Sequence, residues 1–177
     1  MVRYVAFLRG VNVGGINIKM ADLRKMFENL GFDAVKTILA SGNVLFESDR
    51  TDRAHLKKDI ENALNASFGY EAWIVLLDVE TVATIIDRYP FDPEHDGWQP
   101  YVVLSSDPGI LTDLLVLQAD LDPTLEQIAA GDGVLYWEVE RGQTLHSTFG
   151  KETGKKKYKS STTTRNLRTM RKVTASK

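Results

Sequence analysis

A change of hydrophobic period along residues 2–78 constrains the fold more than any other feature of this sequence. Apolar side chains first occur on both faces of a short run, as in a central strand, and then recur at helical spacing. The stretch reads strand, helix, strand, strand, helix, strand, which is the ferredoxin-like, or split β-α-β, arrangement. The expected elements are strand Val2–Leu8, helix Lys19–Leu30, strands Val35–Ala40 and Val44–Glu47, a helix capped by Thr51 or Asp52, and strand Trp73–Leu77.

Residues 79–177 repeat this order less cleanly, because Gly150 and Gly154 weaken the helical pattern near Phe149–Tyr158. We nevertheless predict an α+β protein of two ferredoxin-like lobes with antiparallel sheets, residues 1–78 and 79–177, in which the second lobe ends in a basic helical tail. The expected elements of the second lobe are a helix after Asp78, strand Tyr101–Leu104, helix Gly109–Gln118, hairpin strands Glu126–Ala130 and Val134–Glu140, and a last helix capped by Thr164.

The chain contains no cysteine, which narrows its chemistry. Disulfides, thiolate catalysis and cysteine-ligated zinc are excluded. No apolar run approaches the roughly 20 residues that cross a bilayer, and no signal peptide follows Met1, so we expect a cytoplasmic protein without membrane association. A chain of 177 residues buries enough surface to fold without a metal, and no motif predicts a cofactor.

Charge is distributed unevenly along the chain. Residues 1–150 carry 12 basic and 23 acidic side chains, a net charge of −11, whereas residues 151–177 carry 10 basic and 1 acidic, a net charge of +9. Such a tail either attracts a polyanion such as nucleic acid or folds back onto the acidic body of the protein. Both interpretations stay open at this point.

The Gly-rich loop after the first strand, Arg9-Gly10-Val11-Asn12-Val13-Gly14-Gly15, is the main candidate site. In a split β-α-β unit this loop, the start of the first helix and the turn between strands two and three meet at one edge of the sheet. Free helix N–H groups, small glycines and two cations there predict a pocket for an anion. The candidate ligand-binding residues are Arg9, Asn12, Gly14, Gly15, Lys19, Ser41 and Asn43.

Turn chemistry alone offers a second explanation of the same residues, because Gly, Asn and Ser are the usual residues of tight turns. A Walker phosphate loop is excluded, since Ile16-Asn17 stand where Lys and Ser or Thr are required. An RNA-recognition module is disfavoured, since Asn43 and Leu45 occupy the positions of its stacking aromatics.

Near the C-terminus, Arg165-Asn166 forms a further candidate ligand-binding pair. An arginine binds carboxylate or phosphate bidentately, and a neighbouring asparagine orients the ligand. Alternatively, Thr164, Arg165 and Asn166 cap the last helix. No residue stands out as catalytic: the sequence has no Gly-x-Ser-x-Gly elbow, and its histidines, His55, His95 and His146, show no metal-binding spacing.

Two segments together resemble a known family. They are Phe7-Leu8-Arg9-Gly10-Val11-Asn12-Val13-Gly14-Gly15 and Ser41-Gly42-Asn43-Val44-Leu45-Phe46, and they are similar to the opening of the bacterial family catalogued as domain of unknown function 1697. The run Thr163–Thr169 resembles that family's closing Thr-x-Arg-Asn-Trp-Asn-Thr signature, with Leu167 in place of Trp and Arg168 in place of Asn. The resemblance implies a full-length, cytoplasmic bacterial protein of two ferredoxin-like lobes, and it implies no reaction.

Three functions follow from these observations as hypotheses. The first is binding of an anionic ligand at the Gly-rich loop: a phosphate-bearing small molecule, a nucleotide or a nucleic-acid backbone. The second is an enzyme acting on a small polar metabolite, with Asn12, Ser41 and Asn43 orienting the substrate and Arg165 binding its anionic group. The third is a structural or interaction protein without a small-molecule ligand. The sequence does not specify an oligomeric state.

Overall fold

The computed structural model describes residues 1–9 and 17–177. The chain forms two compact units, residues 1–82 together with 172–177, and residues 83–171. The boundary at residue 82 falls within helix α3 (Val79–Asp87), and the chain re-enters the first unit within helix α7 (Leu167–Ala175). Residues 172–177 therefore belong with the N-terminal unit, although the sequence grouped them with the second lobe.

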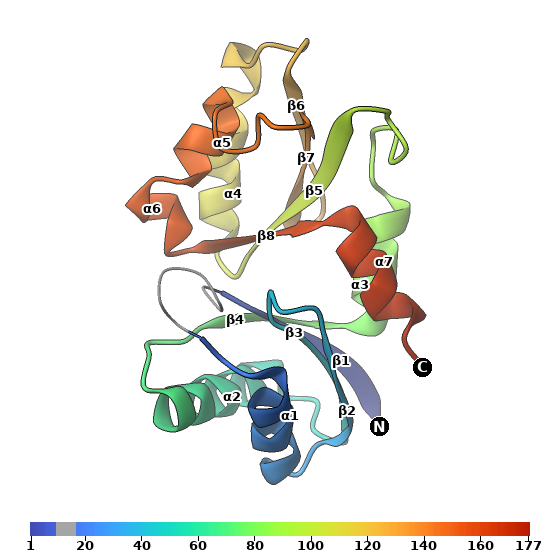
Figure 1. The fold of residues 1–177 in the computed structure, drawn as a ribbon, viewed down its shortest axis with the longest axis vertical. Coiled ribbons are helices and arrows are strands. Elements are labelled where there is room, and N and C mark those ends of the chain that lie inside the picture. Colours follow the sequence, from blue (N-terminus) through green and yellow to red (C-terminus); the bar gives the residue numbers. More distant parts are fainter. Residues whose placement is uncertain (10–16) are drawn as a thin grey trace. The chain divides into compact units, whose positions relative to one another are not determined.

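The first unit has the predicted ferredoxin-like topology (Figure 1). Its sheet has the order β2-β3-β1-β4, with all three pairings antiparallel. Helices α1 and α2 lie on one side of that sheet in Figure 1. In chain order the elements are β1 (Val2–Leu8), α1 (Met20–Asn29), β2 (Asp33–Ile38), β3 (Asn43–Ser48), α2 (Arg53–Phe68) and β4 (Ile74–Asp78).

The core of this unit lies between the sheet and the two helices. Rings from both layers meet there: Phe46 of β3 packs 4.5 Å from Phe32 and 5.5 Å from Phe27, measured between ring centroids. Aromatic pairs at these separations add about 0.5–1.5 kcal/mol beyond the burial of their area. This packing fixes β3, and with it the turn at one end of the strand.

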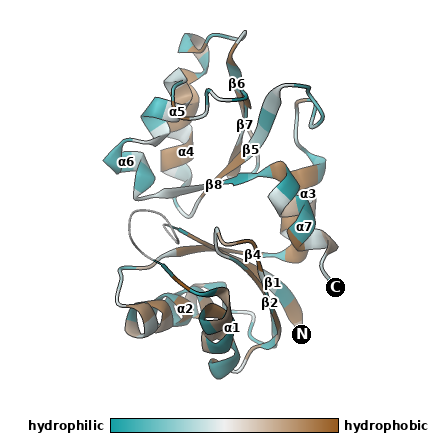
Figure 2. Ribbon diagram, viewed as in Figure 1, coloured by the Kyte–Doolittle hydropathy of each residue, from teal (hydrophilic) through white to brown (hydrophobic). Residues whose placement is uncertain are grey.

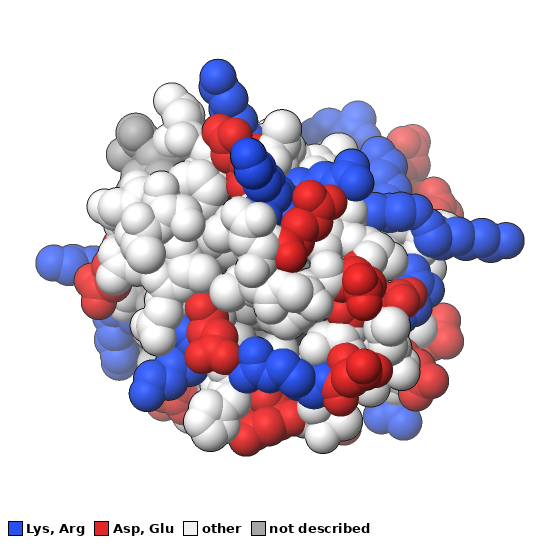
Figure 3. Space-filling model, turned by 90° about the horizontal axis from the view of Figure 1, so that it is seen from below, with Lys and Arg blue, Asp and Glu red and all other residues white. Residues whose placement is uncertain are grey.

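The helix ends are set by residues that the sequence indicates. Asp52 caps α2, because its side chain accepts a hydrogen bond from the backbone N–H of His55. Gly31 and Gly69 adopt positive φ angles of 85° and 67° just after α1 and α2, which is the usual left-handed ending of a helix. Viewed from below, basic and acidic side chains lie next to one another around an uncharged middle (Figure 3).

The second unit repeats the same topology, as predicted. Its sheet has the order β6-β7-β5-β8, so each strand occupies the place of its counterpart in the first unit. Helices α4, α5 and α6 lie along one side of this sheet, and α6 is mainly hydrophilic (Figure 2). The elements are β5 (Trp98–Ser105), α4 (Pro108–Leu115), the 3-10 helix η1 (Val116–Asp120), β6 (Glu126–Ala130), β7 (Val134–Glu140), α5 (Thr148–Thr153), α6 (Lys156–Lys159) and β8 (Thr162–Asn166).

Two differences from the sequence prediction have clear physical reasons. Strand β5 begins at Trp98 and includes Pro100, which lies where β5 has only β7 beside it, since β8 pairs from Tyr101 onward. The expected helix Gly109–Gln118 ends instead at Leu115 and tightens into the 3-10 helix η1.

The C-terminal segment also differs from the prediction, because Thr162–Asn166 is a strand and Thr164 caps no helix. Three consecutive β-branched threonines favour this extended conformation. The cap of α7 is Asn166, whose Oδ1 accepts a hydrogen bond from the backbone N–H of Arg168 at 2.9 Å. In the described ranges, no helix is both long and apolar enough to cross a membrane.

Candidate functional site

The end of β1 and the turn between β2 and β3 meet at one edge of the first sheet, as the topology predicts. Phe7 pairs with Asn43, and the backbone N–H of Leu8 donates to the carbonyl of Gly42 at 2.8 Å. Arg9 follows directly and thus lies beside this turn. The candidate loop residues Asn12, Gly14 and Gly15 lie outside the described residues.

Arg9 is held at this edge by β4. Its backbone N–H donates to the carbonyl of Trp73 at 3.4 Å, and its guanidinium carbon lies 5.5 Å from the centroid of the Trp73 ring. That separation is within the range of a cation–π interaction. Burial lowers the pKa of the Arg9 guanidinium, which still stays charged at neutral pH. Among residues 1–9 and 17–177, no carboxylate oxygen lies within 4.0 Å of this guanidinium.

Trp73 is the residue that the sequence analysis missed. Leu8 pairs with Ile74 across the β1–β4 ladder, so Trp73 lies directly opposite Arg9. The signal was available, because a split β-α-β unit always places its fourth strand beside its first. Both side chains are half-buried, so the pair remains accessible from solvent.

Asn43 has a structural role at this edge. It is fully buried, and its Nδ2 donates to the Ile38 carbonyl at 2.7 Å and to Ser41 Oγ at 3.0 Å. These bonds close a turn that contains positive φ angles at Leu39 (61°) and Gly42 (85°). Turn chemistry therefore accounts for Asn43, whereas Ser41 is exposed.

Replacing Asn43 with alanine is expected to lower the free energy of unfolding by about 2 kcal/mol, because the Ile38 carbonyl loses its buried donor. Urea unfolding measures this loss. Ser41→Ala is the comparison variant: it removes the hydroxyl that accepts from Asn43 Nδ2 at 3.0 Å and leaves the bond to Ile38, so a smaller loss of about 0.5–1 kcal/mol is expected. Equal stability of the two variants would show that Asn43 does not hold the turn.

Lys19 occupies the position before α1 and is exposed. It makes no side-chain capping hydrogen bond to the helix. The first N–H groups of a helix have no partner within the helix and attract negative charge. Lys19 and the start of α1 therefore stay a predicted part of the anion site.

Arg165 and Asn166 do not act as a pair. They are consecutive in β8, opposite Val102 and Tyr101 of β5, so their side chains project to opposite faces of the sheet. Arg165 is 7% exposed and donates to Thr163 Oγ1 at 2.6 Å, and its burial lowers its pKa to about 10. Asn166 donates to Gln99 Oε1 at 3.1 Å and caps α7. One ligand cannot be bound by Arg165 and oriented by Asn166, because strand alternation separates them.

Comparison with known proteins identifies the family. The model of the family described as "Protein of unknown function (DUF1697)" matches residues 1–136. The chain belongs to the DUF1697 family. The matched range contains Arg9, Trp73 and the turn at Ser41, and it ends before the run Thr163–Thr169.

One solved structure similar to this DUF1697 protein agrees with its fold. The conserved bacterial protein SP0830 from Streptococcus pneumoniae is 23% identical, with a TM-score of 0.80 over 98% of this chain and 97% of that one. An unknown protein from Galdieria sulphuraria is 12% identical, with a TM-score of 0.29, and covers 97% of this chain and 86% of its own. A comparison with curated protein sequences found no match.

A second polar cluster lies in the second unit of this DUF1697 protein. Glu138 of β7 is 4% exposed and lies 3.2 Å from His95 Nδ1, while Gln127 Nε2 donates to its other oxygen at 3.3 Å. The His95 ring stacks on Trp98 with centroids 4.5 Å apart. Burial, followed by the charges of Glu138 and Asp92, raises the pKa of Tyr89. These contacts order the loop before β5.

No group of three potential metal ligands occurs in the described parts of the chain.

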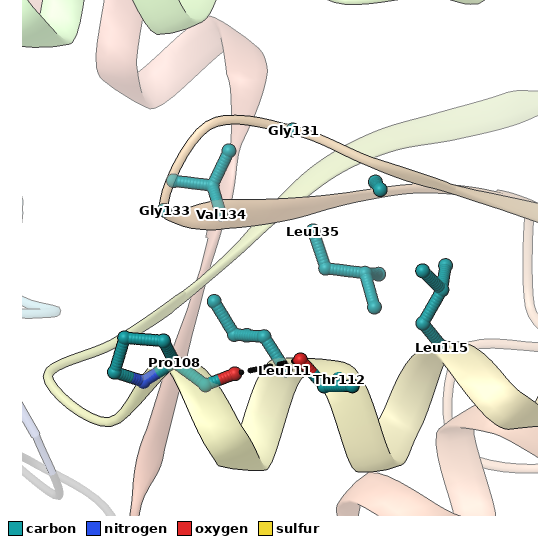
Figure 4. Close-up of a pocket in the computed structure, with 9 residues that line it drawn as sticks. Pro108, Leu111, Thr112, Leu115, Gly131, Gly133, Val134 and Leu135 are labelled. Carbon is teal, nitrogen blue, oxygen red and sulfur yellow. Dashed lines mark hydrogen bonds between the residues drawn. The ribbon is translucent and has the colours of Figure 1, made fainter.

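An apolar pocket of about 150 Å³ lies between α4 and the β6–β7 hairpin (Figure 4). Leu111 and Leu115 of α4 face Val134 and Leu135 of β7 across it. Its only hydroxyl side chain, that of Thr112, donates to the carbonyl of Pro108 at 3.2 Å. None of its lining residues belongs to the predicted anion site, so the pocket is a different place on the molecule.

Proposed function

We propose that this protein binds a small anionic ligand at Arg9, at the edge of the first sheet. The observation that carries the proposal is the half-buried guanidinium of Arg9, which lies over Trp73 and has no carboxylate within 4.0 Å among the described residues. Withdrawing a charged group from water is unfavourable unless a partner compensates it. An anionic ligand supplies that partner.

The chemistry of arginine defines the ligand class. A guanidinium presents several N–H groups in a planar fork that matches the oxygens of a carboxylate or a phosphate. The Trp73 ring restricts the side chain, so that less conformational entropy is lost when the ligand binds. The lowered pKa of Arg9 reflects the same burial that strengthens its interaction with an anion.

Neighbouring groups support an anion in the same place. Ser41 offers an exposed hydroxyl in the turn that meets the end of β1. Lys19 and the start of α1 add positive potential at the other end of the loop. Asn12, Gly14 and Gly15 remain predicted contributors through backbone N–H groups. The proposed ligand is a phosphate-bearing small molecule or a nucleotide, bound in the cytoplasm.

A thermal-shift panel of nucleotides, sugar phosphates, inorganic phosphate and dicarboxylates tests the proposal. A ligand present at 100 times its Kd is expected to stabilise the protein by about 2.7 kcal/mol, which raises Tm by several degrees. Arg9→Ala is expected to abolish the shift. Arg9→Lys is expected to retain only part of it, because lysine keeps the charge and loses the planar fork.

The matched control is Arg24→Ala, which removes an exposed arginine paired with Glu28 on α1 and is expected to leave the shift intact. Circular dichroism checks that each variant is folded. The proposal is wrong if no compound in the panel raises Tm, or if Arg9→Ala responds to the ligand as the wild type does.

A further inference from the structure

The segment Lys151–Lys159, which we call the α5–α6 segment, concentrates positive charge in the second unit. It holds five lysines and one glutamate within nine residues, a net charge of +4. All five lysine side chains are exposed. The lysines are Lys151, Lys155, Lys156, Lys157 and Lys159.

The contacts of these lysines separate the two interpretations of the basic tail. Lys155 pairs with Glu152 of the same segment at 2.7 Å. For the other four lysines, no carboxylate oxygen of the described residues lies within 4.0 Å. Arg171 does reach an acidic residue outside the tail, Glu94 at 3.3 Å. Fold-back onto the acidic body thus describes Arg171, whereas four of the five lysines of the α5–α6 segment have no carboxylate partner among the described residues.

The segment is also anchored in the fold. Tyr158, between Lys157 and Lys159, is 7% exposed and packs in the core of the second unit. Its carbonyl accepts a hydrogen bond from Thr162 Oγ1 at 2.9 Å, which ties α6 to β8. The lysines are therefore presented by a structured surface, so binding them requires little ordering of the backbone.

We propose that the α5–α6 segment binds the phosphate backbone of a nucleic-acid duplex. Closely spaced, uncompensated lysines match the high linear charge density of a duplex and release its counterions on binding. Sequence-independent contact is expected, because contacts to phosphate position a protein and base contacts specify the sequence. This surface is separate from the Arg9 site and does not rest on that proposal.

The surroundings of the lysines favour a duplex over other polyanions. The large exposed apolar side chains of the described chain are Met1, Leu39, Val116 and Leu145, and none lies in the segment. Protein interfaces are enriched in aromatic residues and depleted in lysine, and membrane-surface helices need an exposed apolar face. Binding of single strands relies on exposed aromatic rings, whereas the one ring here, Tyr158, is buried.

Fluorescence anisotropy with a labelled DNA duplex of about 20 base pairs tests this proposal across a salt series. About four phosphate contacts predict a slope of log K against log salt near −3.6. The variant K156Q/K157Q/K159Q is expected to reduce the magnitude of that slope by about 2.7 and to weaken binding at least tenfold at about 50 mM salt.

The matched control is K25Q/K36Q/K58Q, which removes the same charge from exposed lysines of the first unit. This variant is expected to retain most of the wild-type affinity for the duplex. Arg9→Ala is expected to bind the duplex as the wild type does. The proposal is overturned if the wild type fails to bind the duplex at low salt, or if both triple variants lose affinity equally. Tighter binding to polyglutamate or to phosphatidylserine vesicles than to the duplex also overturns it.

Discussion

Gly150→Ala is expected to lower the free energy of unfolding by about 3 kcal/mol. Gly150 lies inside α5, and a Cβ atom built there would stand 1.9 Å from the carbonyl oxygen of Thr144 and 2.9 Å from Ser147 Oγ. The first of these is a backbone atom, so the clash requires either α5 or the preceding loop to move. Such a movement disturbs Phe149, which is fully buried in the core. Urea unfolding followed by circular dichroism measures the loss.

Gly154→Ala is the matched control, because it makes the same substitution four residues further along the chain. A Cβ atom there meets its nearest neighbours at 3.4 Å, and the backbone already has helical angles, φ −75° and ψ −14°. Alanine is expected to be neutral or to stabilise by up to about 1 kcal/mol, since it restricts the unfolded chain. If both variants have the stability of the wild type, the Thr144 carbonyl does not exclude a side chain at position 150, and the prediction is wrong.

These two glycines show where sequence reasoning ends. From the sequence, both are residues that weaken a helix. In the structure Gly154 lies between α5 and α6, as that reasoning suggests. Gly150 instead lies within α5, where the carbonyl of Thr144 in the preceding loop leaves no room for a Cβ atom. Helix propensity is a local property, and a steric requirement from Thr144 has no local signal.

The fold itself was predictable, because hydrophobic periodicity reports burial and both units follow a common order of elements. Each helix and strand of the first unit was expected to within a few residues. The strand β8 was not, since Thr162–Asn166 is short and β8 forms only by pairing with β5, more than 50 residues earlier in the chain. Pairing between strands far apart in sequence is not visible in a local pattern.

The candidate site was predictable only in part, for a related reason. Topology places Arg9 beside the turn at Ser41, and the structure agrees. Residue type alone could not distinguish a ligand-binding asparagine from one that closes a turn, which is the role of Asn43. Likewise, adjacency in sequence suggests one site for Arg165 and Asn166, whereas consecutive positions in β8 place their side chains on opposite faces of the sheet.

Glu126→Ala is expected to lower the free energy of unfolding by about 4 kcal/mol, because two buried donors lose their acceptors. Glu126 is 2% exposed, and its carboxylate accepts the Trp137 Nε1–H and the backbone N–H of Phe149, both at 3.1 Å. It thereby joins β6, β7 and the start of α5. Urea unfolding gives the magnitude, and tryptophan fluorescence reports the change around Trp137.

Glu126→Gln separates the hydrogen bonds from the volume of the side chain. Glutamine fills the same space but offers one acceptor oxygen, so one of the two donors is left facing an NH₂ group, and a loss of about 2 kcal/mol is expected. Glu140→Ala, at the exposed end of β7, is the matched control and is expected to change stability by less than about 0.5 kcal/mol. If Glu126→Gln is as stable as the wild type, a single acceptor is sufficient and Glu126 does not join the three elements. A loss in Glu126→Gln as large as that in Glu126→Ala would instead mean that both hydrogen bonds depend on the carboxylate.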